Sequence, residues 1–300
     1  MQILHVDTGA EMRGGQYQVL LLLEASRNAG HDLQLLARRG SPLFQEGAHY
    51  GISTLPCSLA SVLAESAKTC ILHAHDAHGH TLAAVGSRAR FVVSRRVAFP
   101  IGRGLASRWK YSRPARYIAV SECVARELET AGIARDRIDV VYDAVAPAEL
   151  GTWDPTAPAV ALASVDTGKG RAWIERASEI SGIPVHFSSQ LRVDLRRASM
   201  FVYMTRNEGL GSAALLAMAM GIPVIASKVG GLAEVFEHAR SGLYISNDPE
   251  EAAHAMQQLR SSSDLAFTII ANAKERIRES FTVEKMFADT IASYQRALNG

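Results

Sequence analysis

The residues most suited to chemistry lie in one stretch, 207–234, which combines a carboxylate with tight glycine turns. Its candidate ligand-binding residues are Glu208, Gly209, Leu210, Gly211, Gly230 and Gly231. A carboxylate accepts hydrogen bonds from hydroxyl groups, and glycine lets a phosphate approach backbone amides at the start of a helix. The pattern indicates a site for an anion and a polyol. It also fits an ordinary strand and helix unit whose glycines serve only its turns.

Apolar segments on either side must position these turns. Residues 200–204 predict a buried strand that ends shortly before Glu208, and residues 212–220 predict a short Ala-rich helix ended by a glycine and a proline. A second strand at 222–226 leads into the glycine pair, which we expect to open the next helix. Loops that leave parallel strands at their carboxyl ends line one crevice, so both turns are predicted to share a site.

The stretch resembles the signature of retaining family 4 glycosyltransferases, also called glycosyl transferases group 1. In that family a Glu-Gly-(aromatic or Leu)-Gly turn is followed by a helix, a Gly-x-Pro-Val strand and a Gly-Gly-x-x-Glu turn. The last two elements correspond here to residues 221–224 and 230–234. Further matches follow the family's order over nearly the whole chain: Arg13-Gly14-Gly15, His73-Ala74-His75-Asp76, Ala119-Val120-Ser121-Glu122 and Lys169-Gly170.

The alternation of strand-like and helical segments predicts an α/β fold with parallel sheets. The strands expected in the first half are 3–7, 32–37, 69–74, 91–94, 117–120 and 139–142. The resemblance implies the GT-B fold, in which two Rossmann-like domains face a cleft. We expect an acceptor domain at 1–148, a Pro- and Gly-rich linker at 146–158 and a donor-binding domain at 159–281, with a final helix at 282–298 crossing back onto the first domain.

The second domain is predicted to be trimmed. Its first elements are expected as strands at 160–164 and 184–188 with a helix at 171–180 between them. Only a short connection then fits between Ser188 and Met200, where members of the resembled family usually carry a further strand and helix.

The resemblance implies a role for each matching residue. The predicted catalytic residues are Glu208, Arg96 and His75. The predicted donor-binding residues are Gly14, Gly15, Lys169, Gly209, Leu210, Gly211, Leu216, Gly230 and Gly231. Glu208 would bind the hydroxyls of the transferred sugar, and Lys169 would neutralise the donor diphosphate.

Three positions depart from the family's pattern. Ser164 stands where the arginine partner of Lys169 is usual, and Leu216 replaces a second glutamate that binds the ribose of the nucleotide. Arg95-Arg96 follows the strand after which many relatives place a histidine. Arginine cannot act as a base, but it can bind a phosphate or carboxylate or stabilise a departing diphosphate.

Four histidines and an aspartate between His73 and His80 could in principle bind zinc. His73 and His75 have strand spacing and are predicted to face the same way, with Asp76 at the following turn. The resembled reaction needs no metal, so we expect no metal site and no cofactor. Neither a dinucleotide fingerprint nor a P-loop occurs, which argues against both nucleotide-binding classes.

The composition is that of a soluble globular chain: 300 residues, 48% hydrophobic and 21% charged, with a net charge of +2. Three cysteines without a pairing pattern favour a reducing compartment, and we expect a cytoplasmic protein without a signal peptide or membrane span. Residues 88–116 contain nine arginine and lysine side chains and no acidic residue, and Trp109 and Tyr111 lie among them. This segment is either a solvated basic face or a surface for an anionic acceptor or membrane.

The sequence therefore predicts a retaining, metal-independent glycosyltransferase of envelope polysaccharide synthesis. It would move a sugar from a nucleotide-sugar donor to a glycan or lipid-linked acceptor, with no nucleic-acid partner. A non-catalytic carbohydrate- or nucleotide-binding relative is the first alternative, since residues of the expected site are lost at Ser164 and Leu216. A nucleotide-sugar 2-epimerase, which shares the two-domain architecture, is the second.

Overall fold

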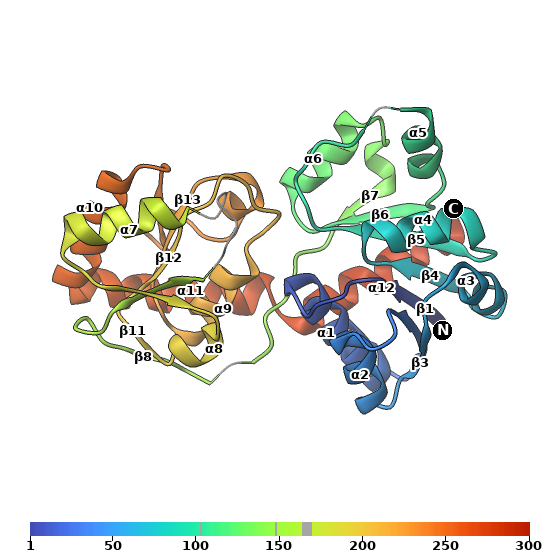
Figure 1. The fold of residues 1–300 in the computed structure, drawn as a ribbon, viewed down its shortest axis with the longest axis horizontal. Helices are drawn as coiled ribbons and strands as arrows, with labels where there is room; N and C mark the ends of the chain where they lie inside the picture. The colour runs from blue at the N-terminus through green and yellow to red at the C-terminus, as the bar shows by residue number, and fades with distance from the viewer. Residues whose placement is uncertain (103, 148, 164–169) are drawn as a thin grey trace. The chain divides into compact units, whose positions relative to one another are not determined.

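Parallel strands form the centre of each of the two units into which the chain divides (Figure 1). The structure is a computed structural model that describes residues 1–102, 104–147, 149–163 and 170–300. Unit 1 contains Met1–Ala144 together with Val283–Gly300, and unit 2 contains Val145–Thr282.

Unit 1 is built on a seven-stranded sheet with the order β3-β2-β1-β4-β5-β6-β7, in which every pairing is parallel. The strands are β1 Gln2–Asp7, β2 Asp32–Ala37, β3 Ser53–Pro56, β4 Ile71–Ala74, β5 Arg90–Arg95, β6 Arg116–Ala119 and β7 Ile138–Val140. The direction of winding reverses between β1 and β4, which is where sheets of this type bind ligands at the carboxyl ends of their strands.

Helices connect these strands and cover both faces of the sheet. They are α1 Gly14–Asn28, α2 Pro42–His49, α3 Leu59–Ser66, α4 Ala77–Gly86, α5 Leu105–Ser112, α6 Glu122–Thr130, the 3-10 helix η1 Arg135–Arg137 and the last helix, α12 Val283–Asn299. Asp76 and Ser121 follow β4 and β6, and their side chains cap the next helix by accepting from backbone N–H groups. These caps explain why the chain turns from strand to helix there.

The core of unit 1 lies between the sheet and the helices α1 and α12. Alternate residues of the strands point into it, such as Ile3 on β1 and Ile71 on β4, and they pack with Leu23 of α1 and Met286 of α12. The last helix thus belongs to the first unit although 138 residues of unit 2 separate them in sequence, residues 145 to 282. Its burial supplies apolar area that the first 144 residues alone would leave open.

Three buried histidines continue this face of the sheet toward the carboxyl ends of β1 and β4. His5 and His73 are register partners, and the ring centroids of His73 and His75 lie 3.9 Å apart. This confirms that His73 and His75 face the same way. The Nδ1 atom of His5 lies 2.9 Å from Nε2 of His75. His5 was not expected in this group, although its alternation with Ile3 could have placed it there.

Hydroxyl groups complete the environment of His73. Its Nδ1 lies 2.7 Å from the hydroxyl oxygen of Tyr294 on α12, and its Nε2 lies 2.7 Å from that of Ser94 on β5. Burial lowers the pKa of His5 to about 3 and lowers the pKa of His73 and His75 well below the usual range. Neutral imidazoles are the form that such an apolar environment tolerates.

Unit 2 contains a five-stranded parallel sheet with the order β10-β9-β12-β13-β14 and a separate pair, β8 and β11. The strands are β8 Thr152–Trp153, β9 Ala159–Leu162, β10 Val185–Ser188, β11 Arg197–Ala198, β12 Phe201–Tyr203, β13 Val224–Ser227 and β14 Leu243–Ile245. The helices are α7 Arg171–Ser181, α8 Leu191–Asp194, α9 Ser212–Met220, the 3-10 helix η3 Gly230–Glu234, α10 Pro249–Ser261 and α11 Ser263–Ser280.

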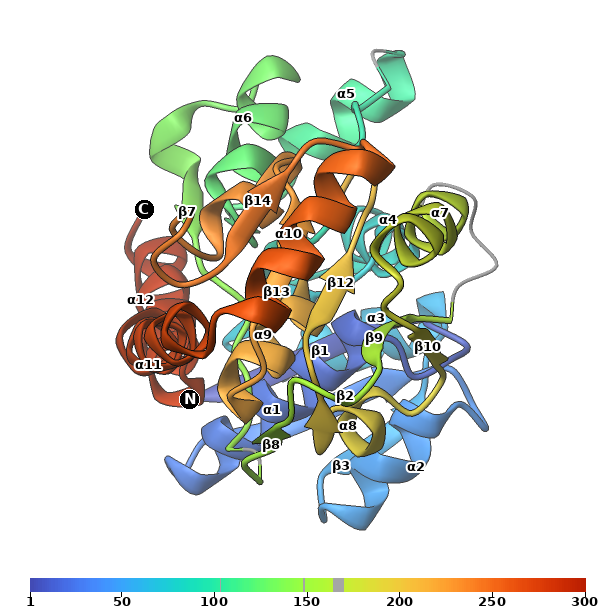
Figure 2. The same ribbon diagram turned by 90° about the vertical axis from the view of Figure 1, so that its left-hand side faces the viewer.

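Helices α7 and α10 lie side by side on one face of this sheet, as Figure 2 shows. Val202 of β12 and Ile225 of β13 pack with Ile174 of α7 and Met256 of α10 in the apolar core. Helix α9 contacts β12 and β13 and also α11. The strands therefore read as continuous apolar runs because helices cover both of their faces.

Two expectations about unit 2 need correction. The segment predicted as a linker, 146–158, lies within unit 2 from residue 145 onward and includes β8, which pairs with β11. The connection after Ser188 holds α8 and β11 in addition to turns. Proline and glycine disfavour long regular elements there but permit a two-residue strand.

The buried histidines should make the stability of the protein sensitive to acid. In the unfolded chain each imidazole binds a proton near pH 6.5, whereas the folded ring does not, so the unfolded state gains protons first as the pH falls. Each such histidine should cost about 1 kcal/mol of unfolding free energy between about pH 6 and pH 5.

The variant H5Q should show a shallower dependence of the urea unfolding midpoint on pH over this range than the unaltered protein. H78Q is the matched control, because His78 is exposed on α4, and it should keep the original slope. Equal slopes for H5Q and the unaltered protein would contradict a neutral His5 in the folded state.

Candidate functional site

The loop after β12 carries Glu208 in a fixed orientation. The hydroxyl of Tyr203, the last residue of β12, donates to one carboxylate oxygen, and the backbone N–H of Gly209 donates to the other at 3.1 Å. Glu208 itself is half-buried. Tyr203 was missed in the sequence analysis because a tyrosine in a buried strand gives no sign of which loop residue its hydroxyl will reach.

The two glycine turns, which were predicted to line one crevice, contact each other directly. The backbone N–H of Gly231 donates to the carbonyl oxygen of Glu208 at 3.0 Å. A Cβ atom at Gly230 would overlap that same carbonyl, and Gly230 has a φ of 52°. Gly211 has a φ of 107°, and a Cβ there would lie 2.6 Å from Leu232. Only glycine allows these loops to approach so closely.

This contact changes what the glycine pair can do. The amide of Gly231 already donates to the carbonyl oxygen of Glu208. The segment also forms only the five-residue 3-10 helix η3 rather than the longer helix that we expected. The prediction of a longer helix here is therefore wrong, whereas the phosphate-binding role of Gly230 stays a prediction and the Gly231 amide already has a partner.

Polar groups near the carboxyl ends of β12 and β13 fix the start of the Glu208 loop through hydrogen bonds. The hydroxyl of Ser227 accepts from the backbone N–H of Thr205 at 2.9 Å and lies 2.6 Å from the side-chain oxygen of Asn247. The Asn247 amide in turn donates to the carbonyl of Thr205 at 3.0 Å. Asn247 was not predicted as part of this site, because it follows a different strand, β14.

Two of the donor-binding predictions concern residues of α9 and its entry. Leu210 is buried, with 2% of its surface exposed, so its side chain is part of the packing beneath the turn. Leu216 lies in the second turn of α9 and is half-buried. The residue offers no hydrogen-bonding group at the position where the resembled family has a carboxylate.

Lys169 and Ser164 lie outside the described residues. Gly170, which follows Lys169, is described and precedes α7 with a φ of 66°. A Cβ atom at Gly170 would lie 2.6 Å from the carbonyl oxygen of Met204, directly after β12. The start of α7 therefore packs closely against the carboxyl end of β12, beside the loop that carries Glu208.

In unit 1 the structure brings Arg96 to the start of α1. A Cβ atom at Gly15 would lie 3.6 Å from Cδ of Arg96, and Gly14 is the first residue of the helix. The Nε atom of Arg96 donates to Asp143 at 3.1 Å, while the buried Nη1 has no hydrogen-bond partner among the described residues. Arg96 therefore lies beside Gly15 in the first turn of α1.

Asp143 is the partner of Arg96 that the sequence analysis did not find. Its side chain is 7% exposed, at the end of the segment that follows β7. Gln18 of α1 fixes the next residue, Ala144, by donating to its carbonyl at 2.8 Å and accepting from its N–H at 2.9 Å. The guanidinium of Arg96 is thereby held in place from both α1 and β7.

His75 lies immediately after β4 and is 5% exposed. Its Nε2 is paired with His5, and its Nδ1 has no hydrogen-bond partner among the described residues. Burial and the neighbouring His73, His5 and Arg96 keep the ring neutral by lowering its pKa. A neutral ring of this kind can donate or accept one hydrogen bond, but it is a poor proton acceptor.

The wider histidine cluster proposed from sequence separates into different environments. Asp76 caps α4 and accepts from the hydroxyl of Thr8, His78 is exposed, and His80 lies 3.1 Å from the carbonyl oxygen of Lys110. Within the described chain His5, His73 and His75 have nitrogens within 4.8 Å of one another. Because both nitrogens of His73 already meet hydroxyl groups, only two rings remain for an ion, fewer than zinc sites in proteins use.

Many cationic side chains of the acid-free segment 88–116 have partners in the folded protein that are distant in sequence. Five of its cationic side chains are held by partners in unit 1: Arg90 by the carbonyl of Ala297, Arg95 by the hydroxyl of Tyr111, Arg96 by Asp143, Lys110 by the carbonyl of Ala77 and Arg116 by Asp139. The acids that balance this segment come from β7 and the residues after it, far along the chain.

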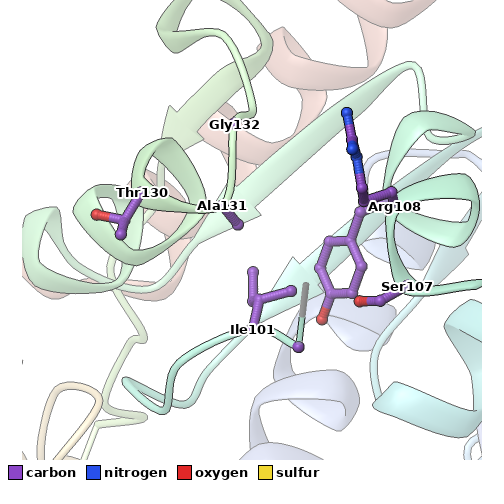
Figure 3. Close-up of a pocket in the computed structure, with 8 residues that line it drawn as sticks. Ile101, Ser107, Arg108, Thr130, Ala131 and Gly132 are labelled. Carbon is purple, nitrogen blue, oxygen red and sulfur yellow. The ribbon is translucent and has the colours of Figure 1, made fainter. Parts of the chain in front are cut away.

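Helix α5 remains an exposed part of that segment. None of its residues is buried, and the exposed fractions of Leu105, Trp109 and the preceding Phe99 are 84%, 50% and 61%. A cavity of about 260 Å³ lies between α5 and the end of α6, with Ser107, Arg108 and Thr130 among its lining residues (Figure 3). Cations and apolar side chains therefore share one surface.

Comparisons with known proteins identify the family to which this chain is similar. The family model described as Glycosyltransferase Family 4 matches residues 12–149, and that described as Glycosyl transferases group 1 matches residues 132–262. A D-inositol 3-phosphate glycosyltransferase of Jonesia denitrificans is 29% identical over 53% of this chain and 39% of its own length. An uncharacterized glycosyltransferase of Methanocaldococcus jannaschii is 30% identical over 34% of this chain and 27% of its own length. The chain thus spans well under half of these relatives.

Solved structures match over almost the full chain. HepE of Anabaena, in complex with UDP and glucose, has a TM-score of 0.86 at 14% identity, and the match covers 98% of this chain and 99% of that one. A glycosyltransferase of Rickettsia africae has a TM-score of 0.81 at 17% identity, covering 100% and 99%. The extent of unit 2 is therefore shared with other proteins of this fold. From the two family matches and these folds, the chain belongs to the group 1 glycosyltransferases of family 4 and has the GT-B fold.

Proposed function

We propose that the protein transfers a sugar from a nucleoside diphosphate sugar to a hydroxyl group of a glycan or lipid-linked acceptor, with retention of anomeric configuration and without a metal ion. In this step the bond between the anomeric carbon and the diphosphate oxygen breaks. The acceptor oxygen bonds to the same carbon, and the acceptor's proton leaves with the diphosphate.

The observation that carries this proposal is the fixed Glu208 loop at the carboxyl end of β12. Its carboxylate is oriented by Tyr203 and Gly209, and its backbone is seated against Gly230 and Gly231. HepE, which shares the fold, has been solved with UDP-glucose and with UDP and glucose. A half-buried carboxylate that is held in one orientation can bind sugar hydroxyls without first paying the entropy of ordering itself.

The leaving group must be stabilised as charge develops on its oxygen, and this is where most of the catalysis is expected. Lys169 is proposed to hold the diphosphate as a flexible point charge. The amides of Gly209 and Gly211 and the side chain of Leu210 would border the sugar ring, with Leu216 further along α9. These roles follow from the family's motif and from the close packing of Gly170 against the end of β12.

Unit 1 is proposed to contribute Arg96 and His75, together with the backbone at Gly14 and Gly15. Arg96 has an unpaired, buried Nη1 next to the start of α1, which suits an anionic group of either substrate. His75 has an unpaired Nδ1 and stays neutral, so we assign it a hydrogen bond to a substrate hydroxyl rather than proton transfer.

We further propose that α5 brings the protein to the anionic inner face of a membrane, where a lipid-linked acceptor would be found. No helix in the described residues is long and apolar enough to span a membrane. The exposed Leu105 and Trp109 share α5 with Arg108, a combination suited to shallow contact with lipid headgroups. Such contact would place a cytoplasmic enzyme at its substrate.

Leu216 favours one alternative, a non-catalytic relative that binds a nucleotide or carbohydrate, because it removes a group that would hold the donor's ribose. Slow hydrolysis of a nucleotide sugar by the isolated protein would argue against that alternative. Formation of an epimer from the donor alone, with no transfer to any acceptor, would instead indicate a nucleotide-sugar 2-epimerase.

Glu208→Gln should lower the rate of sugar transfer by more than about tenfold, because the amide keeps the shape of the side chain but loses the charge that strengthens bonds to hydroxyls. Turnover of a nucleotide sugar with acceptor is measured, and circular dichroism checks the fold. The matched control is E179Q, since Glu179 is an exposed residue on α7 in the same unit. Unchanged transfer by E208Q would remove Glu208 from the proposed site.

The leucine at position 216 should leave nucleotide affinity weak and insensitive to the ribose. We expect a dissociation constant in the high micromolar range or poorer, because a carboxylate bonded to a vicinal diol contributes about 1.5–3 kcal/mol. Calorimetric titration with UDP and 2′-deoxy-UDP should give similar affinities, and L216E should strengthen binding of UDP more than of the deoxy form. Tight binding by the unaltered protein that is lost with the 2′-hydroxyl would show that another residue holds the ribose.

Contact of α5 with anionic lipid should weaken with salt, since the Debye length falls from about 10 Å at 0.1 M to about 3 Å at 1 M. In liposome flotation the protein should float with anionic vesicles at low salt and much less with neutral ones. The double variant L105A/W109A should lose this binding, whereas F267A, which removes an equally exposed aromatic residue of unit 2, should keep it. Equal binding to both kinds of vesicle, or to neither, would contradict the membrane role.

A further inference from the structure

Two cationic side chains at the carboxyl ends of neighbouring strands of unit 2 have no acidic partner among the described residues. Arg206 follows β12 and Lys228 follows β13, and these strands pair through Tyr203 and Ala226. Both side chains are exposed, and neither forms a salt bridge with any residue that the structure describes. Most other arginines of this unit have an acidic partner: Arg171, Arg176, Arg196, Arg197, Arg240, Arg276 and Arg278.

Aromatic rings hold both cations in place of acids. The guanidinium carbon of Arg206 lies 5.5 Å from the centroid of the Trp173 ring, and Nζ of Lys228 lies 6.0 Å from that of Tyr244. Contact with a ring face orients a cation but leaves its charge and its N–H donors available to a ligand. An acidic partner would neutralise the charge instead.

Because Arg206 contacts Trp173, it lies near the start of α7. Trp173 is the third residue of that helix, and Gly170 before it packs against the carbonyl of Met204. The first turn of α7 contains no acidic residue, so its positive end is not offset locally. Arg206 also lies two residues before Glu208, whose carboxylate is already hydrogen-bonded to Tyr203 and Gly209. The cation and the proposed sugar-binding loop therefore share one edge of the sheet.

We propose that Arg206, supported by Lys228, binds the diphosphate of the donor and takes over the role of the arginine that Ser164 replaces. This assignment rests on the proposed function, because it concerns the same donor. A planar guanidinium donates two parallel N–H groups to phosphate oxygens, and its stacking on Trp173 reduces the freedom that it must lose on binding. Gly231 cannot serve instead, since its amide is bonded to the Glu208 carbonyl.

The test is calorimetric titration of the full chain with inorganic pyrophosphate, UDP and uridine. R206A should weaken binding of pyrophosphate and UDP by about ten- to a hundredfold and leave binding of uridine unchanged, because only the phosphate contact is lost. The affinity of R206K for pyrophosphate and UDP should lie between those of R206A and the unaltered protein, since lysine keeps the charge without the planar pair of donors. W173A should weaken UDP binding less than R206A.

R192A is the matched control. Arg192 is an exposed arginine of α8 in the same unit and has no ion pair among the described residues. Its removal changes the net charge by the same amount as R206A. The affinities for pyrophosphate, UDP and uridine should therefore stay unchanged. The proposal is overturned if R206A binds UDP as the unaltered protein does, if it loses uridine to the same extent, or if the unaltered protein binds neither pyrophosphate nor UDP.

The two proposals can fail separately. Loss of UDP binding in R206A together with no sugar transfer by the unaltered protein would support the diphosphate site and reject the transferase. Sugar transfer by the unaltered protein with unchanged UDP binding and turnover in R206A would do the reverse.

Discussion

The contact between two backbone turns in unit 2 is the constraint on which its site depends. The carbonyl oxygen of Glu208 accepts from the amide of Gly231, and the absence of a side chain at Gly230 lets the two turns come this close. The orientation of the Glu208 carboxylate follows from this seat and from the hydroxyl of Tyr203. A side chain at position 230 would push the turns apart and release the carboxylate as well, so backbone geometry and chemistry cannot be separated here.

Unit 1 has a different constraint, because an arginine and three buried histidines lie close together near the carboxyl ends of its parallel strands. The cation has a carboxylate partner in Asp143, while the histidines stay neutral and share hydrogen bonds with one another and with Ser94 and Tyr294. A protonated histidine next to Arg96 would repel it in a medium that screens charge poorly. Neutral rings therefore add no positive charge beside the guanidinium.

The sequence predicted the parallel sheets and most of their helices because continuous apolar runs and glycine or proline breaks are local signals. It also predicted that the turns at 208–211 and 230–231 line one crevice, but not that they contact each other. It did not predict the side-chain partners, since Asp143, Tyr203 and Asn247 reach the site from other elements through the tertiary fold. The same limit explains why the run 88–116 seemed free of partners: Asp139, which pairs with Arg116, comes from the next strand of the sheet.

The presence or absence of an acidic partner distinguishes the arginines that stabilise the fold from the cations that we propose bind a ligand. Arg116 and Arg96 are paired with buried carboxylates, an arrangement in which removing either partner would leave a costly unpaired charge. Arg206 and Lys228 rest on aromatic rings at the surface and cost the fold little, because water still solvates them. The ring contacts orient both cations without neutralising them, so under our proposal a diphosphate would bind side chains that have already lost part of their freedom.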